Sequence, residues 1–297
     1  MKDQTKAYLY AISAILCWST IASAFKLTLQ YMDFVEVLFY SSFISTSVLW
    51  LLIVSQGKTA LLYRIDWKDT RHAAFRGLLN PFLYYLVLLK SYTLLKAQEA
   101  GTLNYIWPIT LVLLSIPLLK QKIRLLSIFA IVVSFSGILV ISTEGHLSSL
   151  SFREPLGVFL ALASSIFWAL YWIFNVKDKK DELVKLFMNF GFGTVFIFIY
   201  LVFFHGMGLP STEGLLGSFY IGLFEMSLTY FLWLMGLKYS VNTAKVSNLV
   251  YISPFISLII IQQVIGEQIL ISTVVGLILI VTGILVQAVT KPGKQKT

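Results

Sequence analysis

Ten long apolar stretches, separated by short polar segments, dominate the chain. Each holds roughly 20 mostly apolar residues, which is the length a helix needs to cross the hydrocarbon core of a bilayer. They are expected near residues 7–25, 34–54, 73–89, 97–119, 123–142, 155–175, 183–204, 214–237, 241–264 and 269–289. This pattern predicts an all-α integral membrane protein with ten transmembrane helices.

Composition supports a membrane protein, because 58% of the residues are hydrophobic and only 12% are charged. A soluble domain carries about a quarter charged residues. The net charge of +9 does not indicate nucleic-acid binding, since the basic residues flank the apolar stretches. No phosphate-binding glycine loop, paired histidines or nucleophilic triad is visible, so the sequence predicts no cofactor, no metal site and no enzyme.

The basic residues also predict the orientation of the chain. If ten helices alternate in direction, 19 of the 23 Lys and Arg lie on the side of the N-terminus. The cytoplasmic side of a membrane protein is enriched in Lys and Arg. We therefore expect a multi-pass protein of the cell (inner or plasma) membrane with both termini in the cytoplasm.

The two halves of the chain resemble one another when the second is laid over the first without a gap. The aligned pairs include Tyr105 with Tyr251, Pro108 with Pro254, and Gly137 with Gly283. Five helices in each half would make the copies enter the membrane in opposite senses. The prediction is two inverted repeats, residues 1–148 and 149–297, an architecture of transporters with a site near the bilayer midplane.

The repeat bears on the first stretch, which also resembles a signal peptide. Lys2 and Lys6 precede an apolar run that ends in the small residues Ala22-Ser23-Ala24. This is the pattern of a cleavable leader. Because the first repeat needs this helix to reach five, we expect the helix to be retained.

Counting inward from the helix ends places polar and aromatic residues near the midplane of six helices. The candidate substrate-binding residues are Trp18, Asn80, Tyr84, Asn104, Trp107, Trp168, Tyr171, Glu225 and Tyr251. Pro108 and Pro254 are candidate hinges, since they occupy equivalent places in the repeat. The other four helices have apolar centres, so a central cavity is expected among the six. Interfacial belts and interhelical hydrogen bonding are the alternative roles for these side chains.

Glu225 is the sharpest single candidate. A carboxylate at the centre of a spanning helix costs roughly 3 kcal/mol on insertion scales and indicates a functional site by default. The residue type suits binding of a substrate amine, transport of a coupling proton, or a structural pairing with a hydroxyl or a lysine. The sequence leaves these three roles open.

Several motifs resemble the drug/metabolite transporter superfamily, EamA type, over the whole chain. They are Trp18–Thr20, Asn104–Pro108, Tyr251–Pro254 and Gly266-Glu267. The Asn104–Pro108 stretch is most similar to the bacterial aromatic amino-acid exporter (YddG-like) branch. The resemblance implies a basket of ten helices and a central cavity lined by Trp107 and Trp168. Small multidrug resistance relatives exchange protons through a glutamate in their first helix, and neither the first nor the sixth predicted helix here contains an acid.

The sequence thus predicts an exporter of small amphiphilic metabolites, with aromatic or other hydrophobic amino acids as the leading class, working by alternating access between the repeats. Its expected partners are a small-molecule substrate and the lipid bilayer, with a proton as a candidate coupling ion and no nucleic acid. A monomer and a homodimer both fit. The alternatives are export of cationic drugs or other metabolites and, in a different class, a membrane-embedded enzyme or sensor.

Overall fold

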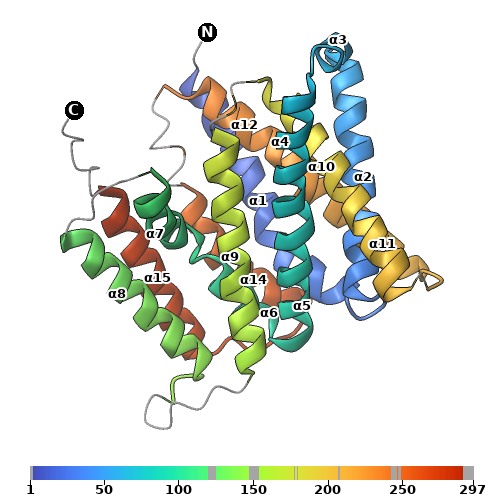
Figure 1. Ribbon diagram of the computed structural model, residues 1–297. Coiled ribbons are helices and arrows are strands. Elements are labelled where there is room, and N and C mark those ends of the chain that lie inside the picture. The colour runs from blue at the N-terminus through green and yellow to red at the C-terminus, as the bar shows by residue number, and fades with distance from the viewer. Residues whose placement is uncertain are drawn as a thin grey trace.

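The computed structural model describes residues 3–119, 125–146, 154–176, 178, 180–206, 208–241, 246 and 249–289, and the regular elements within these ranges are all helical (Figure 1). Six segments are long and apolar enough to cross a membrane: Gln4–Thr28, Phe34–Ser55, Ala97–Leu118, Pro155–Asn175, Glu182–His205 and Thr212–Tyr239. Three shorter apolar helices span Ile128–Ser142, Leu249–Val264 and Ile271–Val286. The expectation of a helical membrane protein is confirmed, and the count of ten spans stays a prediction.

The first half of the chain contains α1 (Gln4–Thr28), α2 (Phe34–Ser55), α3 (Thr59–Leu62), α4 (Trp67–Gly77), η1 (Leu78–Leu83), α5 (Tyr84–Leu94), α6 (Ala97–Asn104), α7 (Trp107–Leu119) and α8 (Leu125–Ser142). Aspartates at the preceding position begin three of these helices. Asp3, Asp33 and Asp66 each accept a backbone N–H from the first turn of α1, α2 and α4. Such caps satisfy amide groups that have no partner inside the helix.

The second half contains α9 (Pro155–Val176), α10 (Glu182–Tyr200), η2 (Leu201–His205), α11 (Thr212–Tyr220), η3 (Ile221–Leu228), α12 (Thr229–Tyr239), η4 (Leu249–Ile252), α14 (Ser253–Val264) and α15 (Ile271–Val289). Asp181 and Ser211 cap α10 and α11 in the same way. The segments η2 and η3 are wide, π-type turns that continue the neighbouring α-helices, whereas η1 contains a break at Asn80 between α4 and α5. Apolar stretches of the sequence therefore fold into helices built from more than one piece.

Two pairs of helices with apolar centres stand at opposite edges of the molecule (Figure 1). At one edge α8 packs along α15, and at the other α2 packs against α10. Small residues bring α8 and α15 close: a Cβ on Gly137 would lie 2.5 Å from the carbonyl oxygen of Gly276. Close approach through small residues is how helices associate in lipid. The outward faces of this pair, including Phe129 and Val132, are apolar and exposed.

Between the two edges, α1 lies at the centre of the bundle. It contacts α5 and α6 from the first half and η3, α11, α12, η4 and α14 from the second (Figure 1). Its buried face includes Ala11, Ile15 and Ser19, and the Ser19 hydroxyl lies 3.0 Å from that of Ser253. The central helix thus joins the two halves of the chain.

The third predicted span, residues 73–89, is interrupted, which the sequence reasoning missed. Asn80 has an extended backbone (φ −148°, ψ 120°) in the middle of the run from α4 to α5. The ring of a proline disfavours the helical region for the residue before it, and Pro81 follows Asn80. An Asn-Pro step inside an apolar run was the available signal.

The candidate hinges Pro108 and Pro254 also mark interruptions rather than bends within a helix. Each is the second residue of a helix, α7 and α14. Proline is tolerated there because the first amides of a helix have no intrahelical partner. The chain turns at Tyr105-Ile106 before α7, and the short 3₁₀ segment η4 precedes α14. The hinge role of these two prolines stays a prediction.

Candidate functional site

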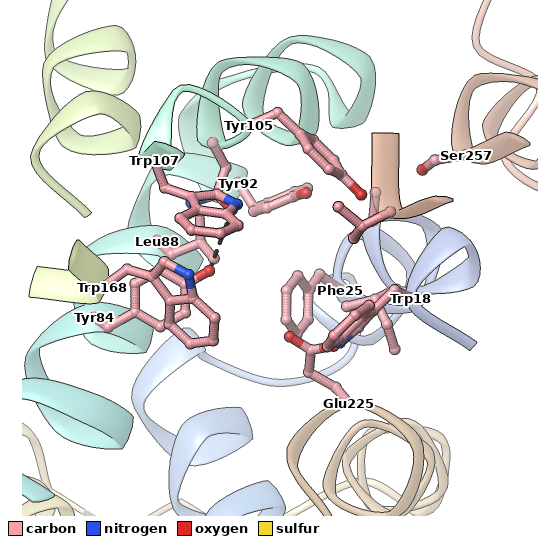
Figure 2. Close-up of a pocket in the computed structure, with 15 residues that line it drawn as sticks. Trp18, Phe25, Tyr84, Leu88, Tyr92, Tyr105, Trp107, Trp168, Glu225 and Ser257 are labelled. Atoms are coloured by element: carbon pink, nitrogen blue, oxygen red, sulfur yellow. Dashed lines mark hydrogen bonds between the residues drawn. The ribbon is translucent and has the colours of Figure 1, made fainter. Parts of the chain in front are cut away.

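A cavity of about 120 Å³ lies beside the middle of α1 (Figure 2). Its walls come from α1, α5, α6, α7, α9, η3, η4 and α14. These segments belong to the six predicted helices that carry polar and aromatic residues at their centres. Both halves of the chain contribute to the lining.

Six of the nine candidate substrate-binding residues line this cavity: Trp18, Tyr84, Asn104, Trp107, Trp168 and Glu225. Aromatic rings form one wall. The Trp168 ring centroid lies 4.6 Å from that of Tyr84 and 6.4 Å from that of Trp107, with the two indoles nearly perpendicular at 77°. Such edge-to-face contacts hold the rings in fixed orientations.

The facing wall is aromatic as well and carries the carboxylate (Figure 2). Trp18 packs against Trp233 at 5.3 Å between ring centroids, and Phe25 packs edge-on against Tyr85 at 6.3 Å. Figure 2 shows Glu225 below Trp18 and Phe25 on this side. A solute in the cavity would therefore lie between two sets of rings.

Neutral hydrogen bonds orient the polar part of the first wall. The Tyr84 hydroxyl donates to Asn104 Oδ1 at 3.2 Å, and Asn104 Nδ2 donates to Ser164 Oγ at 3.1 Å. The Ser164 hydroxyl in turn donates to the Ala161 carbonyl at 2.7 Å. A primary amide has two N–H groups, so Asn104 keeps a donor besides the one that Ser164 receives.

Glu225 is 8% exposed, and within the described ranges one hydrogen bond holds its side chain. The Tyr85 hydroxyl donates to its Oε1 at 2.8 Å. Its Oε2 is buried and has no hydrogen-bond partner among the described residues. A carboxylate accepts several hydrogen bonds, so this oxygen is available to a group that enters the cavity.

Asn80, Tyr171 and Tyr251 do not line the cavity, which corrects their expected position. Asn80 is fully buried at the interruption of the α4–α5 run. The Tyr171 ring packs on Trp168, and its hydroxyl accepts from Asn189 Nδ2 of α10 at 3.4 Å. Tyr251 lies half-buried in η4, where its neighbour Val250 reaches the cavity instead. Depth in the membrane was the basis of these three candidates, and depth does not fix the direction of a side chain.

The cavity also contains residues that the sequence reasoning did not select. Phe25, Tyr92 and Tyr105 are the aromatic ones among these, and the rings of Phe25 and Tyr92 contact each other at 5.3 Å between centroids. A signal existed for Phe25, because Ile21 and Phe25 follow Trp18 at helical steps of three and four and so share its face. Tyr92 is related in the same way to Leu88 and Tyr84, at steps of four.

Comparison with known proteins places the chain in a family. The model of the EamA-like transporter family matches residues 5–143 and again residues 155–288. This chain belongs to the EamA-like transporter family. It is 25% identical over 294 residues to an uncharacterized transporter of Clostridium kluyveri, covering 94% of this chain and 91% of the relative.

The other relatives of this EamA-like transporter agree with that assignment. An uncharacterized transporter of Helicobacter pylori is 27% identical over 236 residues, covering 75% of this chain and 76% of the relative. The uncharacterized transporter YvbV of Bacillus subtilis is 26% identical over 217 residues, covering 70% and 68%. A solved crystal structure aligns with 96% of this chain and 97% of its own at a TM-score of 0.65 and 20% identity, which shows a shared fold. The protein is thus a membrane transporter.

One end of this transporter is held together by what we call the Glu267 cluster, which consists of Lys26, Gln98, Glu267 and the backbone groups that they bind. Gly266 has φ +76°, a left-handed conformation that ends α14 and that side chains rarely adopt. The carboxylate of Glu267 then accepts the first amides of α6, from Ala97 at 2.9 Å and from Gln98 at 3.3 Å. The Gly266-Glu267 motif therefore joins the second half to the first.

Gln98 strengthens this connection, whereas Lys26 makes its hydrogen bonds within the first half. Gln98 Nε2 donates to the Gln268 carbonyl at 2.9 Å, and its Oε1 accepts the Leu270 N–H at 2.9 Å. Lys26 Nζ donates to the carbonyls of Tyr92 and Leu95, at 2.9 and 2.6 Å, where α5 ends. A cation at a helix C-terminus is favoured by the helix dipole.

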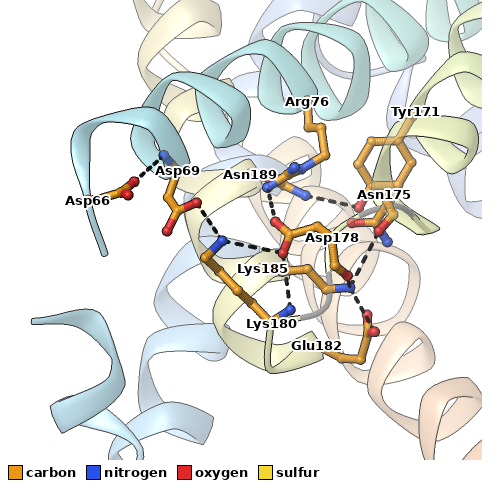
Figure 3. Close-up of polar contacts among 10 residues, drawn as sticks. All are labelled: Asp66, Asp69, Arg76, Tyr171, Asn175, Asp178, Lys180, Glu182, Lys185 and Asn189. Carbon is orange, nitrogen blue, oxygen red and sulfur yellow. Dashed lines mark hydrogen bonds and ion pairs between the residues drawn. The ribbon is translucent and has the colours of Figure 1, made fainter. Parts of the chain in front are cut away.

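A second group of charged and polar side chains lies where α4 meets the α9–α10 connection (Figure 3). We call it the Arg76 cluster, and it consists of Asp69, Arg76, Asp178, Lys180, Lys185 and Asn189. Arg76 and Asp178 form an ion pair at 2.9 Å, with side chains only 6% and 9% exposed. Arg76 Nε also donates to Asn189 Oδ1 at 3.2 Å, and Asn189 donates onward to Tyr171. Because Tyr171 packs on Trp168, this chain of contacts runs from the ion pair to the cavity wall.

Further pairs surround Asp178. Lys180 Nζ lies 2.5 Å from Asp69 and 3.5 Å from Asp178, and Lys185 Nζ donates to the Asp178 carbonyl at 2.9 Å. Burial alone raises the pKa of the Asp178 carboxyl, but the Lys180 backbone N–H and the charges of Arg76, Lys180 and Lys185 outweigh it and hold that pKa below its usual value. The negative charge of the Asp178 carboxylate is therefore compensated by neighbouring cations.

The described residues contain no group of three or more His, Cys, Asp and Glu side chains placed to hold a metal ion. The expected absence of a metal and of a cofactor stays a prediction.

Proposed function

We propose that this EamA-like transporter exports small amphiphilic metabolites, with aromatic and other hydrophobic amino acids as the leading class, through the cavity beside α1. The observation that carries the proposal is the lining itself: two facing aromatic walls, a row of neutral hydrogen-bonding groups and one carboxylate. Aromatic rings bind flat or hydrophobic groups through stacking. The carboxylate accepts hydrogen bonds from an ammonium group.

The small size of the cavity supports a metabolite over a drug or a nucleotide sugar. Sites for drug-sized ligands enclose roughly 300–1,000 Å³, whereas this cavity encloses about 120 Å³. A nucleotide sugar would also need cationic groups for its phosphates. No Lys, Arg or His belongs to the cavity lining in the described ranges.

We propose alternating access between residues 1–148 and 149–297, arranged as two inverted repeats of five spans. The pairing of helices supports it: the fifth predicted span packs on the tenth, and the second on the seventh, as equivalent elements related by a twofold axis would. Opening of the end near α6 would require the Glu267 cluster to separate, since its bonds join the halves there.

The proposed orientation puts the N-terminus, α3 and the start of α4 in the cytoplasm of a cell with an inner or plasma membrane, and the Glu267 cluster on the outer side. Figure 1 shows the N-terminal label, α3 and α4 at one end of the bundle, opposite α5 and α6. Lys58, Arg64 and Lys68 lie in the α2–α4 segment, as the positive-inside rule requires. A cysteine introduced at residue 149 should react with an impermeant reagent from outside, and a reporter fused to the C-terminus should be active only inside.

The proposed transport is tested by counterflow in proteoliposomes. Purified protein is loaded with unlabelled phenylalanine or tryptophan, and uptake of the labelled compound is followed with and without a pH gradient. Exchange that is absent from empty vesicles supports the proposal, and stimulation by the gradient supports a proton as the coupling ion. Absence of exchange with every aromatic and branched-chain amino acid would contradict it.

A further inference from the structure

Among the described residues of the cavity lining, Glu225 is the only one with a charged side chain, and only one of its two carboxylate oxygens has a hydrogen-bond partner. Tyr85 binds one oxygen, and the other is buried without a partner. A buried charge is tolerated when a counter-charge or several hydrogen bonds compensate it. Within the described residues no ion pair involves Glu225, so none of their side chains supplies a compensating charge.

The side chains around Glu225 favour a cationic ligand. Trp18, Phe25 and Glu225 line the same cavity, and Figure 2 shows the two rings on the side of the cavity from which Glu225 enters. Aromatic faces attract a desolvated cation through their quadrupoles. A carboxylate with neighbouring rings therefore forms a cage for an ammonium group.

The described residues that line the rest of the cavity include no cationic side chain. The remaining polar lining groups are the neutral side chains of Asn104, Tyr84, Tyr92, Tyr105 and Ser257, besides the tryptophan N–H groups. The Tyr84 hydroxyl already donates to Asn104 Oδ1, and one N–H of Asn104 already donates to Ser164 Oγ. A substrate carboxylate would thus meet neutral donors only, in the same small space as Glu225.

We infer that the preferred substrates are singly charged aromatic amines, with an ammonium group at Glu225, a flat ring between Trp168 and Trp18, and no carboxylate. This inference rests on the proposed function and narrows it: among amphiphilic metabolites, an amine is taken in preference to the amino acid with the same ring. The zwitterion brings a second charge that the cavity repels.

Three probes with the same indole ring separate the charge states: tryptamine (a cation), tryptophan (a zwitterion) and indole-3-propionate (an anion). Their affinities for the full-length protein are measured by calorimetry in detergent and by inhibition of counterflow in proteoliposomes. Tryptamine is expected to bind at least tenfold more tightly than tryptophan, and indole-3-propionate least of all. Tryptophan binding as tightly as tryptamine would overturn the inference and leave the proposed transport function standing.

The variant Glu225→Gln assigns the preference to this carboxylate, with Glu36→Gln as its matched control. Glu36 is also 8% exposed, but it lies in α2 away from the cavity, and its Oε1 accepts the Gly208 N–H at 2.7 Å. Glu225→Gln should erase the tenfold advantage of tryptamine, while Glu36→Gln should keep it. An advantage that survives Glu225→Gln would contradict the inference.

The comparison of probes on the unaltered protein needs no variant, so it decides the inference even if Glu225→Gln fails to fold. Binding and exchange of none of the three indoles would be a different result. It would reject the proposed function together with the inference, and so it is distinguishable from a wrong order of affinities.

Discussion

The cavity and the Glu267 cluster each contain a glutamate that reaches across from the second half of the chain, and the two side chains are used differently. At Glu267 both carboxylate oxygens accept backbone amides at the start of α6. At Glu225 one oxygen accepts the Tyr85 hydroxyl and the other has no partner among the described residues. A satisfied carboxylate stabilises the fold, whereas an oxygen without a partner is available to a ligand.

The Arg76 cluster extends this comparison to the other end of the bundle. There Asp178 is also largely buried, but a guanidinium, two ammonium groups and a backbone N–H face it. The carboxylates of Asp178 and Glu267, one near each end of the bundle, therefore have partners for their oxygens, whereas Glu225 in the middle keeps one oxygen without a partner among the described residues. This difference indicates where a ligand acts and where the fold is held together, and it can be tested by removing one group at a time.

The largest effect is expected from Arg76→Met. Removing one partner of a buried ion pair leaves the other charge uncompensated and costs about 3–5 kcal/mol. The melting temperature of the detergent-purified variant should fall accordingly. Lys58→Met is the control, since the Lys58–Asp181 pair at 2.8 Å is 29% exposed on each side, and such pairs contribute about 0–1 kcal/mol. Equal melting of the two variants would mean that the Arg76 pair does not hold this end.

A smaller effect is expected at the aromatic walls, and on affinity rather than stability. Trp107→Ala and Trp168→Ala should each weaken substrate binding about tenfold, because a stacking partner contributes about 0.5–1.5 kcal/mol beyond the area it buries. Trp50 is the control, because it lies in α2, 42% exposed, and packs on Phe187 away from the cavity. If Trp50→Ala weakened binding as much as Trp168→Ala, at matched expression, the tryptophans would act through folding.

Glu267→Gln should cost about 1 kcal/mol of stability, the usual contribution of a side-chain cap. The amide retains one acceptor oxygen for the start of α6 and loses the charge that favours a helix N-terminus. The effect should appear in thermal melting and in the rate of exchange, while the affinity for substrate stays unchanged. A change in affinity without a change in melting would place Glu267 in the binding site and remove its contrast with Glu225.

The smallest effect is the contribution of Asp178 to the pH dependence of stability. Its pKa is lower in the folded protein than the usual value of 3.8. Such a group stabilises the fold above its unfolded pKa, and this contribution is lost as the pH falls through the folded pKa. Melting should therefore be insensitive to this group above about pH 5 and should decline in more acidic buffer. The decline should be smaller in Asp178→Asn, and an identical decline would assign it to other carboxylates.

Prediction from sequence succeeded best where one helix decides the outcome by itself. Trp18 was selected for its depth along the first apolar stretch, and it lines the cavity with the next residues of its helical face. Depth follows from counting residues, since each adds 1.5 Å along a helix. The same counting selected Asn80 and Tyr171, which lie at suitable depth but point into contacts between helices.

The amino-acid sequence alone predicted the class of this protein. The apolar stretches and the sparse charges indicated membrane helices, because hydrophobicity is a local property of each stretch. The motifs shared with EamA-type proteins indicated a transporter. Only the tertiary structure decided which midplane side chains meet the cavity and which are held by neighbours. The partner of Glu225 is 140 residues away, and the partners of Glu267 are 170 and 169 residues away. In lipid, shape and hydrogen bonding rather than hydrophobicity decide which faces of two helices pack together. The rotation of each helix about its axis is therefore set by its neighbours.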